Sequence, residues 1–262
     1  MTHCRTATAL LSLGLALAAL AGAGCRNANI LSKEEEIRIG RDGATRIEET
    51  YPVSRNPADQ SLVERIGQKI ATVNNLDWPF TFKVLEDKQV NAISLPGGPV
   101  YVFRGLLNLS EGNEDEIALV IAHEIAHIER RHVAKMYTQG VLTDLVILLG
   151  TQGTAQTAAQ VVQMFAEMRF SRDDEYESDR LGIQYAYKAG FDPNGLIRFF
   201  EKLKRLEGEN KGDIVSNNLR THPLTDARIK RAKEEIAKVV QAVNREQETA
   251  ALLRALNNSN SR

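Results

Sequence analysis

The sequence has little cysteine, no excess of either charge and no long hydrophobic run. Only Cys4 and Cys25 occur, and Cys4 lies in a segment that we expect to be removed, so the mature chain has no internal disulfide. The formal net charge is -1, from 33 basic and 34 acidic residues, which argues against a nucleic-acid partner. The apolar stretches at 7–21 and 141–150 are shorter than the roughly 20 residues of a membrane span.

The composition is that of a soluble globular protein. Hydrophobic residues make up 43% and charged residues 26% of the 262 residues, enough for one sizeable domain with tails or for two small domains. We expect a signal peptide at 1–24, a linker at 25–31, the main domain at 32–245 and a C-terminal tail at 246–262.

The N-terminus has the layout of a bacterial secretory signal peptide. A charged start with Arg5 precedes a short apolar run, and small residues follow it up to Cys25. A cysteine at that point resembles a lipobox, in which the thiol is lipidated and the chain is cut just before it. The alternative is ordinary cleavage after Ala23. We expect the lipid on Cys25 to hold the protein in the bacterial cell envelope, facing the periplasm from the outer membrane.

The periodicity of apolar residues predicts an α+β fold that is mainly helical, with one small β-sheet near the middle. A polar loop is expected at 207–218 and disorder at 257–262. The predicted helices are 32–49, 59–73, 115–136, 141–150, 158–170, 173–188, 193–206 and 225 to beyond 240, and the predicted strands are 80–85, 90–94 and 100–103.

The motif that indicates chemistry is His123-Glu124-Ile125-Ala126-His127, an H-E-x-x-H pattern inside an apolar helix. Residues four apart share one face of a helix, so both imidazoles reach one metal ion. Glu124 follows the first ligand and is placed to act on a metal-bound water as general base. The pattern predicts a catalytic site with one Zn²⁺ per chain.

A catalytic zinc site usually has a third protein ligand. The candidates are His132, His222 and the acidic segment 173–179. Within that segment Glu175 and Asp179 share a helix face. Glu175 is expected to bind zinc, and Asp179 to accept a hydrogen bond from a liganding imidazole.

Several motifs in order resemble one family, the zinc peptidases HtpX, LoiP and BepA, which are related to the CAAX-prenyl proteases. The resemblance implies a gluzincin-type domain with zinc ligands His123, His127 and Glu175 and with Glu124 catalytic. Ser178 departs from the alanine common in relatives. Without the repeat domain of BepA or the spans of HtpX, the chain is most similar to small LoiP-like lipoprotein peptidases. The motifs are 122–127, 170–172, Glu175-x-x-x-Asp179 with 180–182, and 221–223 with 228–229.

The expected function is a zinc-dependent endopeptidase that hydrolyses misfolded or unfolded envelope proteins. His222 is expected to stabilise the oxyanion or to act as a fourth ligand, unless it only caps the last helix. Asn91, Ala92 and Ile93 are expected to form an edge strand that pairs with substrate, unless they belong to an internal hairpin. The alternative function is a chaperone or assembly factor for outer-membrane proteins with a latent or structural zinc.

Overall fold

The structure is a computed structural model that describes residues 29–140, 160, 163–164, 168–208 and 221–260. It confirms a mainly helical α+β fold with one small sheet. The strands are β1 (Thr81–Leu85), β2 (Ala92–Ser94) and β3 (Pro99–Phe103). The helices are α2 (Lys33–Thr50), α3 (Pro57–Val73), α4 (Arg104–Ser110), α5 (Glu114–Glu129), α6 (His132–Thr138), α9 (Arg172–Lys188), α10 (Gly195–Gly208) and α12 (Asp226–Asn260).

The sheet is mixed and has the strand order β1-β3-β2. β1 pairs parallel to β3, and β2 pairs antiparallel to it. The turn between the last two strands forms at Gly97 and Gly98, whose φ angles are 77° and 134°. Only glycine adopts such angles without strain, which explains why the turn carries two of them.

The two edges of the sheet differ. At the β1 edge, the amide of Gln60 donates to the carbonyl of Phe82 at 2.6 Å and accepts from the N–H of Val84 at 3.1 Å. This side chain from α3 covers part of the edge, and the backbone at 52–54 pairs with the rest: the N–H of Ser54 donates to the carbonyl of Val84, and the N–H of Glu86 to that of Pro52, both at 2.8 Å. Together they protect the edge from pairing with another chain.

At the β2 edge, the main chain is arranged for pairing. The N–H of Phe103 donates to the carbonyl of Asn91 at 3.0 Å, so Asn91 belongs to the hydrogen-bonded ladder with β3. Hydrogen-bonded pairs alternate along an antiparallel strand. The main-chain groups of Ala92 and Ser94 therefore point away from β3.

Side-chain caps begin the helices that matter for the site. A capping box formed by Ser32 and Glu35 begins α2. Asn113 caps α5 by accepting from the N–H of Glu116 at 3.2 Å. A second capping box, Ser171 with Asp174, begins α9 and was not predicted. Such caps satisfy N–H groups that have no partner inside the helix.

The prediction of one helix over 115–136 was wrong, because the helix stops at Glu129 and α6 begins at His132. Arg131 between them has a left-handed backbone, with φ 56°. Its side chain bonds the carboxylate of Glu36 and the carbonyl of Leu31, both from the N-terminal part of the chain. These distant contacts stabilise a turn that no local glycine or proline signals.

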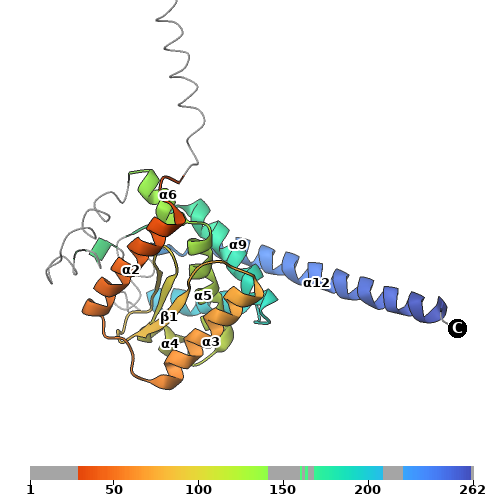
Figure 1. Ribbon diagram of the computed structural model, residues 1–262. Coiled ribbons are helices and arrows are strands. Elements are labelled where there is room, and N and C mark those ends of the chain that lie inside the picture. The colour runs from red at the N-terminus through yellow and green to blue at the C-terminus, as the bar shows by residue number, and fades with distance from the viewer. Residues whose placement is uncertain (1–28, 141–159, 161–162, 165–167, 209–220, 261–262) are drawn as a thin grey trace, which may run out of the picture.

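Helix α5 forms the centre of the core, and Figure 1 shows it behind the sheet beside α9. Its residues 116–128 are all buried. α9 crosses it closely at Gly182, where a Cβ atom would lie only 3.0 Å from the backbone N of His123. This close approach brings side chains of the two helices to one point.

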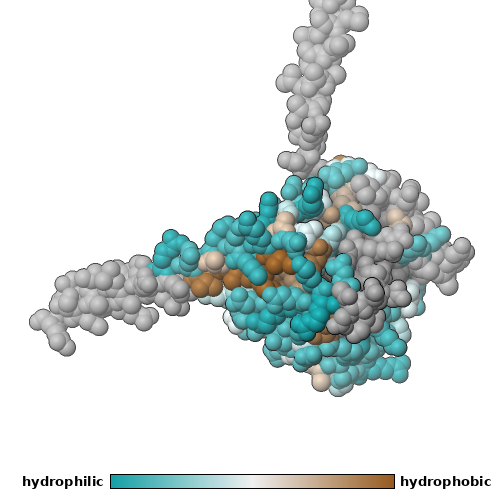
Figure 2. Space-filling view, turned by 180° about the vertical axis from the view of Figure 1, so that it is seen from behind, coloured by the Kyte–Doolittle hydropathy of each residue, from teal (hydrophilic) through white to brown (hydrophobic). Residues whose placement is uncertain are grey.

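The C-terminal helix α12 extends away from the body in Figure 1, and hydrophobic surface follows its base in Figure 2. The prediction of disorder from Asn257 was wrong up to Asn260, because α12 extends to that residue. The predicted helix at 141–150 and most of the predicted helix at 158–170 lie outside the described residues. The end of the second prediction, Met168 to Phe170, is not helical. Among the residues described, no helix is both long and apolar enough to cross a bilayer.

Candidate metal centre

The H-E-x-x-H motif lies on α5 with both imidazoles directed to one point. The Nε2 atoms of His123 and His127 are 3.0 Å apart. The side chains are 6% and 0% exposed, so these polar groups need partners inside the protein.

Helix α9 brings Glu175 to the same point. Its Oε2 atom lies 3.6 Å from Nε2 of His123, and its Oε1 atom lies 3.5 Å from Nε2 of His127. Glu175 is itself 2% exposed. Three side chains from two helices thus share one buried space.

His222 joins them from the segment that precedes α12. Its Nδ1 atom lies 2.8 Å from Oε1 of Glu175 and 3.3 Å from Nε2 of His123. One ligand atom from each of His123, His127, Glu175 and His222 lies within 4.8 Å of every other.

This donor set fits a metal ion. At metal–ligand distances of about 2.0–2.1 Å, the ligand atoms of a tetrahedral zinc site are about 3.3 Å apart, which matches the observed spacing. Lone pairs of imidazoles and a carboxylate that face one another repel unless a cation lies between them. Imidazole and carboxylate ligands suit zinc among the common metals.

The protonation states of His127 and Glu175 also favour metal binding. Burial lowers the pKa of His127 well below its ordinary value, which keeps its lone pair free. Burial opposes ionisation of Glu175, but the charges of His222 and Arg228 hold the pKa of that carboxyl well below its usual range. Burial also lowers the pKa of His222, but the carboxylates of Glu175 and Glu124 raise it more; a bound cation would replace that proton.

Asp179 and Arg228 support the ligands from outside. Oδ1 of Asp179 lies 3.0 Å from Nδ1 of His123. Arg228 donates two hydrogen bonds to Asp179, at 2.6 and 2.9 Å, and its Nη1 atom lies 2.7 Å from Oε2 of Glu175. Arg228 thus pairs with two buried carboxylates at once, and its single positive charge leaves one negative charge for a metal ion to balance; this role of Arg228 was not predicted from the sequence.

Glu124 lies beside the site, and each of its oxygens is close to a different group. Its Oε2 atom accepts a hydrogen bond of 2.6 Å from the hydroxyl of Ser94, and its Oε1 atom lies 3.5 Å from Nε2 of His222. A cavity of about 20 Å³, large enough for one water molecule, adjoins Glu124 and His222, and apolar side chains of α10 form much of the rest of its lining. Ser94 was not recognised from the sequence, since only its place on β2 brings it here.

His132 is not among the metal-facing side chains. It lies behind His127, with the Nδ1 atoms of the two rings 2.9 Å apart. Phe170 covers the other side, with ring centroids 4.0 Å from His127 and 5.4 Å from His222. Of the candidates for further ligands, Glu175 and His222 are therefore the two that meet the motif.

The remaining predicted residues lie around this centre. Ala92 and Ile93 belong to β2 and Asn91 precedes it, beside the strand position that bonds Glu124. Cys25 lies outside the described residues.

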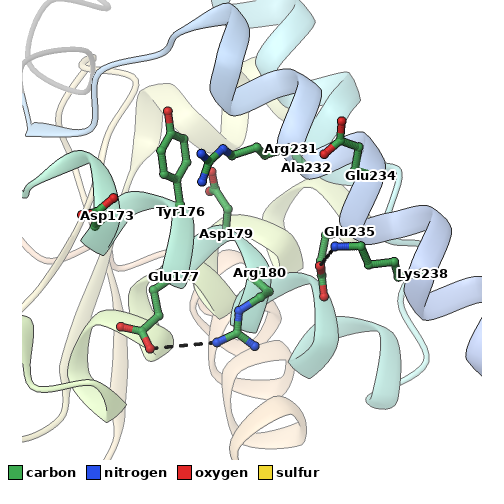
Figure 3. A pocket seen from close by; sticks show the side chains of 10 residues that line it. All are labelled: Asp173, Tyr176, Glu177, Asp179, Arg180, Arg231, Ala232, Glu234, Glu235 and Lys238. Atoms are coloured by element: carbon green, nitrogen blue, oxygen red, sulfur yellow. Dashed lines mark hydrogen bonds and ion pairs between the residues drawn. The ribbon is translucent and has the colours of Figure 1, made fainter.

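A separate polar cleft of about 570 Å³ lies between α9 and α12 (Figure 3). Arg231 lies over the ring of Tyr176 there at 3.9 Å. Glu177 and Asp179 leave α9 in different directions in this view, as the helical spacing predicts (Figure 3).

Comparison with known proteins identifies relatives that are peptidases. Residues 57–236 match peptidase family M48. The chain is 29% identical over 222 residues to the beta-barrel assembly-enhancing protease of Yersinia pestis, covering 78% of this chain and 44% of that protein. The corresponding protein of Escherichia coli K12 is 27% identical, with 80% and 45% covered. The mitochondrial metalloendopeptidase OMA1 of Schizosaccharomyces pombe is 29% identical, with 80% and 63% covered.

A buried H-E-x-x-H helix that meets a carboxylate from a second helix defines a metallopeptidase domain of the gluzincin type. The chain belongs to peptidase family M48, whose match covers most of the sequence. It spans less than half the length of the bacterial relatives named above.

Replacing Arg228 tests the charge balance of this centre. Arg228→Met leaves two buried carboxylates without their cation, so we expect the free energy of unfolding to fall by about 3–5 kcal/mol. Arg231→Met, on the exposed side of the same helix, should change it by less than about 1 kcal/mol. Urea denaturation with chelator present measures both, and equal stability of the two variants would contradict the assignment.

Proposed function

We propose that the protein is a zinc-dependent endopeptidase that hydrolyses misfolded or unfolded proteins of the cell envelope. The observation that supports this most directly is the convergence of His123, His127 and Glu175 beside Glu124. The names of its relatives, a beta-barrel assembly-enhancing protease and a metalloendopeptidase, agree with peptide-bond hydrolysis.

The two motif histidines and Glu175 would hold the zinc ion. When bound, zinc lowers the pKa of a coordinated water toward about 7 and polarises a peptide carbonyl. Asp179 keeps the ring of His123 in place and, paired with Arg228, does so without an unbalanced buried charge.

Glu124 is the proposed general base. Ser94 donates to its Oε2 atom and thereby fixes the carboxylate plane, which leaves Oε1 directed toward His222 and the water-sized cavity. Oε1 accepts the proton of the attacking water, and the carboxyl then gives it to the leaving amine. Nε2 of His222 lies 3.5 Å from Oε1 of Glu124, so His222 can donate to the developing oxyanion only when its ring is not bound to the metal as a fourth ligand.

Substrate is proposed to bind by adding a strand at β2. The outward main-chain groups of Ala92 and Ser94 offer hydrogen bonds that do not depend on the sequence of the bound chain. The side chain of Ser94 also bonds the general base, so a strand paired there would pass next to it. This mode of binding suits a protease that acts on unfolded chains.

The proposed location follows from the N-terminus. A lipidated Cys25, at the end of a signal-like segment, would anchor the protein to the outer membrane with the domain in the periplasm. Substrates would then be unfolded or misfolded proteins of the same compartment.

A second candidate function is a chaperone or assembly factor with a latent zinc. The observation that favours it is the position of His222, whose Nδ1 atom lies among the proposed ligand atoms. Four protein ligands fill a tetrahedral zinc site and leave no place for water. Whether His222 stays or withdraws then decides between a closed and an active centre.

Glu124→Gln tests the proposed mechanism. The amide keeps the shape of the side chain but accepts no proton, so cleavage of casein should fall by about 10²–10⁴-fold while zinc content and the melting temperature stay unchanged. Glu129→Gln, at the end of the same helix, is the matched control and should cleave normally. Undiminished cleavage by Glu124→Gln would remove Glu124 from the mechanism.

His222→Ala separates the two roles of that residue. If His222 closes the site as a fourth ligand, the variant keeps its zinc on three ligands and cleaves casein faster than the unaltered protein, which is the result we expect. A fall of 10²-fold or more with full zinc content would instead assign His222 to oxyanion stabilisation. Zinc content and initial rates measure the difference.

Ala92→Pro tests strand addition at β2. Proline removes the outward N–H of this position but leaves the bonds to β3, so the KM for unfolded casein should rise about five- to tenfold, the value of one hydrogen bond. Ala92→Ser retains the N–H and should keep the normal KM. Equal KM values for the two variants, with zinc retained, would show that substrate does not pair at this edge.

A further inference from the structure

We infer that His132 is a positioning residue for the metal ligand His127: it accepts a hydrogen bond from Nδ1–H of His127 and so fixes the tautomer and orientation of that ring. This inference rests on the proposed zinc site. It concerns a side chain that does not itself face the metal.

The contact is buried and direct. The two Nδ1 atoms are 2.9 Å apart, and the rings meet edge to face with their planes at 74°. His132 and His127 are 2% and 1% exposed. Within the described part of the chain, no other polar atom is recorded as close to Nδ1 of His127.

The positions of the ring hydrogens of His127 and His132 follow from the atoms that face each ring nitrogen. Nε2 of His127 faces the other ligand atoms, so it must carry the lone pair and Nδ1 must carry the hydrogen. Nδ1 of His132 must then be the acceptor, which places the hydrogen of His132 on Nε2. That atom lies 3.4 Å from Oε2 of Glu177 and 3.5 Å from Oδ1 of Asp174. One pair of tautomers therefore satisfies all four ring nitrogens.

The two carboxylates near Nε2 of His132 also pair with basic side chains. Glu177 lies 2.8 Å from Nε of Arg130, and Asp174 lies 2.6 Å from Nζ of Lys135. Each outer carboxylate thus has a basic partner of its own, and Nδ1 of His132 is left to accept from His127. The other motif ligand, His123, differs, because a charged carboxylate supports it.

The break between α5 and α6 makes this contact possible. At 3.6 residues per turn, a residue five positions along an unbroken helix points about 140° away from the first. His132 would then face away from His127. The left-handed turn at Arg131 returns the chain, and His132 comes to lie against the motif.

NMR of the zinc-loaded protein labelled with ¹⁵N in its histidines tests the tautomers directly. After removal of the signal peptide, four histidines remain of the five in the sequence, so the spectrum is simple. We expect His132 to carry its hydrogen on Nε2 and His127 on Nδ1. A hydrogen on Nδ1 of His132 would overturn the inference, and this result does not depend on any variant.

Substitutions of His132 test what the contact does. His132→Phe fills the space without an acceptor and should weaken zinc binding by about 10–100-fold and change the cobalt(II) absorption spectrum. His132→Asn offers an oxygen near the position of Nδ1 and should restore affinity to within about threefold. Ser178→Ala is the matched control, because it removes a buried hydroxyl 3.4 Å from the same nitrogen but leaves the His127 contact intact.

The outcomes separate this inference from the proposed function. Equal loss in the Phe and Asn variants, or unchanged affinity and spectrum in both, would overturn the positioning role. If His132→Phe does not fold, the tautomers in the unaltered protein decide. An unaltered protein that binds zinc but cleaves nothing would contradict the proposed peptidase and leave the role of His132 intact.

Discussion

The burial of two carboxylates from α9 against the imidazoles of α5 is the constraint on which the rest of the site depends. Glu175 and Asp179 are 2% and 4% exposed, and an unpaired charge at such depth is strongly destabilising. Arg228 on α12 pairs with both carboxylates but offsets only one of the two charges, and the imidazoles complete a space suited to a further cation. The close crossing of α5 and α9 at Gly182 holds this arrangement, because any side chain there would press on the backbone of His123.

Spacing within one helix is what the sequence predicts well. The four-residue intervals His123–His127 and Glu175–Asp179 are both reproduced, since helical geometry alone sets them. Ser94 and Arg228 were missed because their roles arise only when β2 and α12 pack against the motif helix. Arg131 gives no local signal either: its left-handed turn depends on bonds to residues about a hundred positions earlier.

The two edges of the sheet differ in whether a further strand can pair with them. Gln60 occupies main-chain groups at the β1 edge. A chain bound there would lie on the opposite edge of the sheet from β2. At β2, the strand proposed to accept substrate also contacts Glu124, the proposed general base, through Ser94. Strand addition at β1 would place a peptide away from the proposed metal centre, whereas the proposed strand addition at β2 would place it beside that centre.

The N-terminal helix is linked to the metal centre through the turn at Arg131. Glu36 of α2 pairs with Arg131, Arg131 sets the start of α6, and α6 carries His132 to His127. Loss of the Glu36 pair would leave a left-handed arginine without the contacts that offset its backbone strain. α2 begins at Lys33, eight residues after Cys25, so the segment that would follow the proposed lipid anchor also supports the proposed metal ligand His127. The geometry of the centre therefore depends on the chain's N-terminal region as well as on the motif helix.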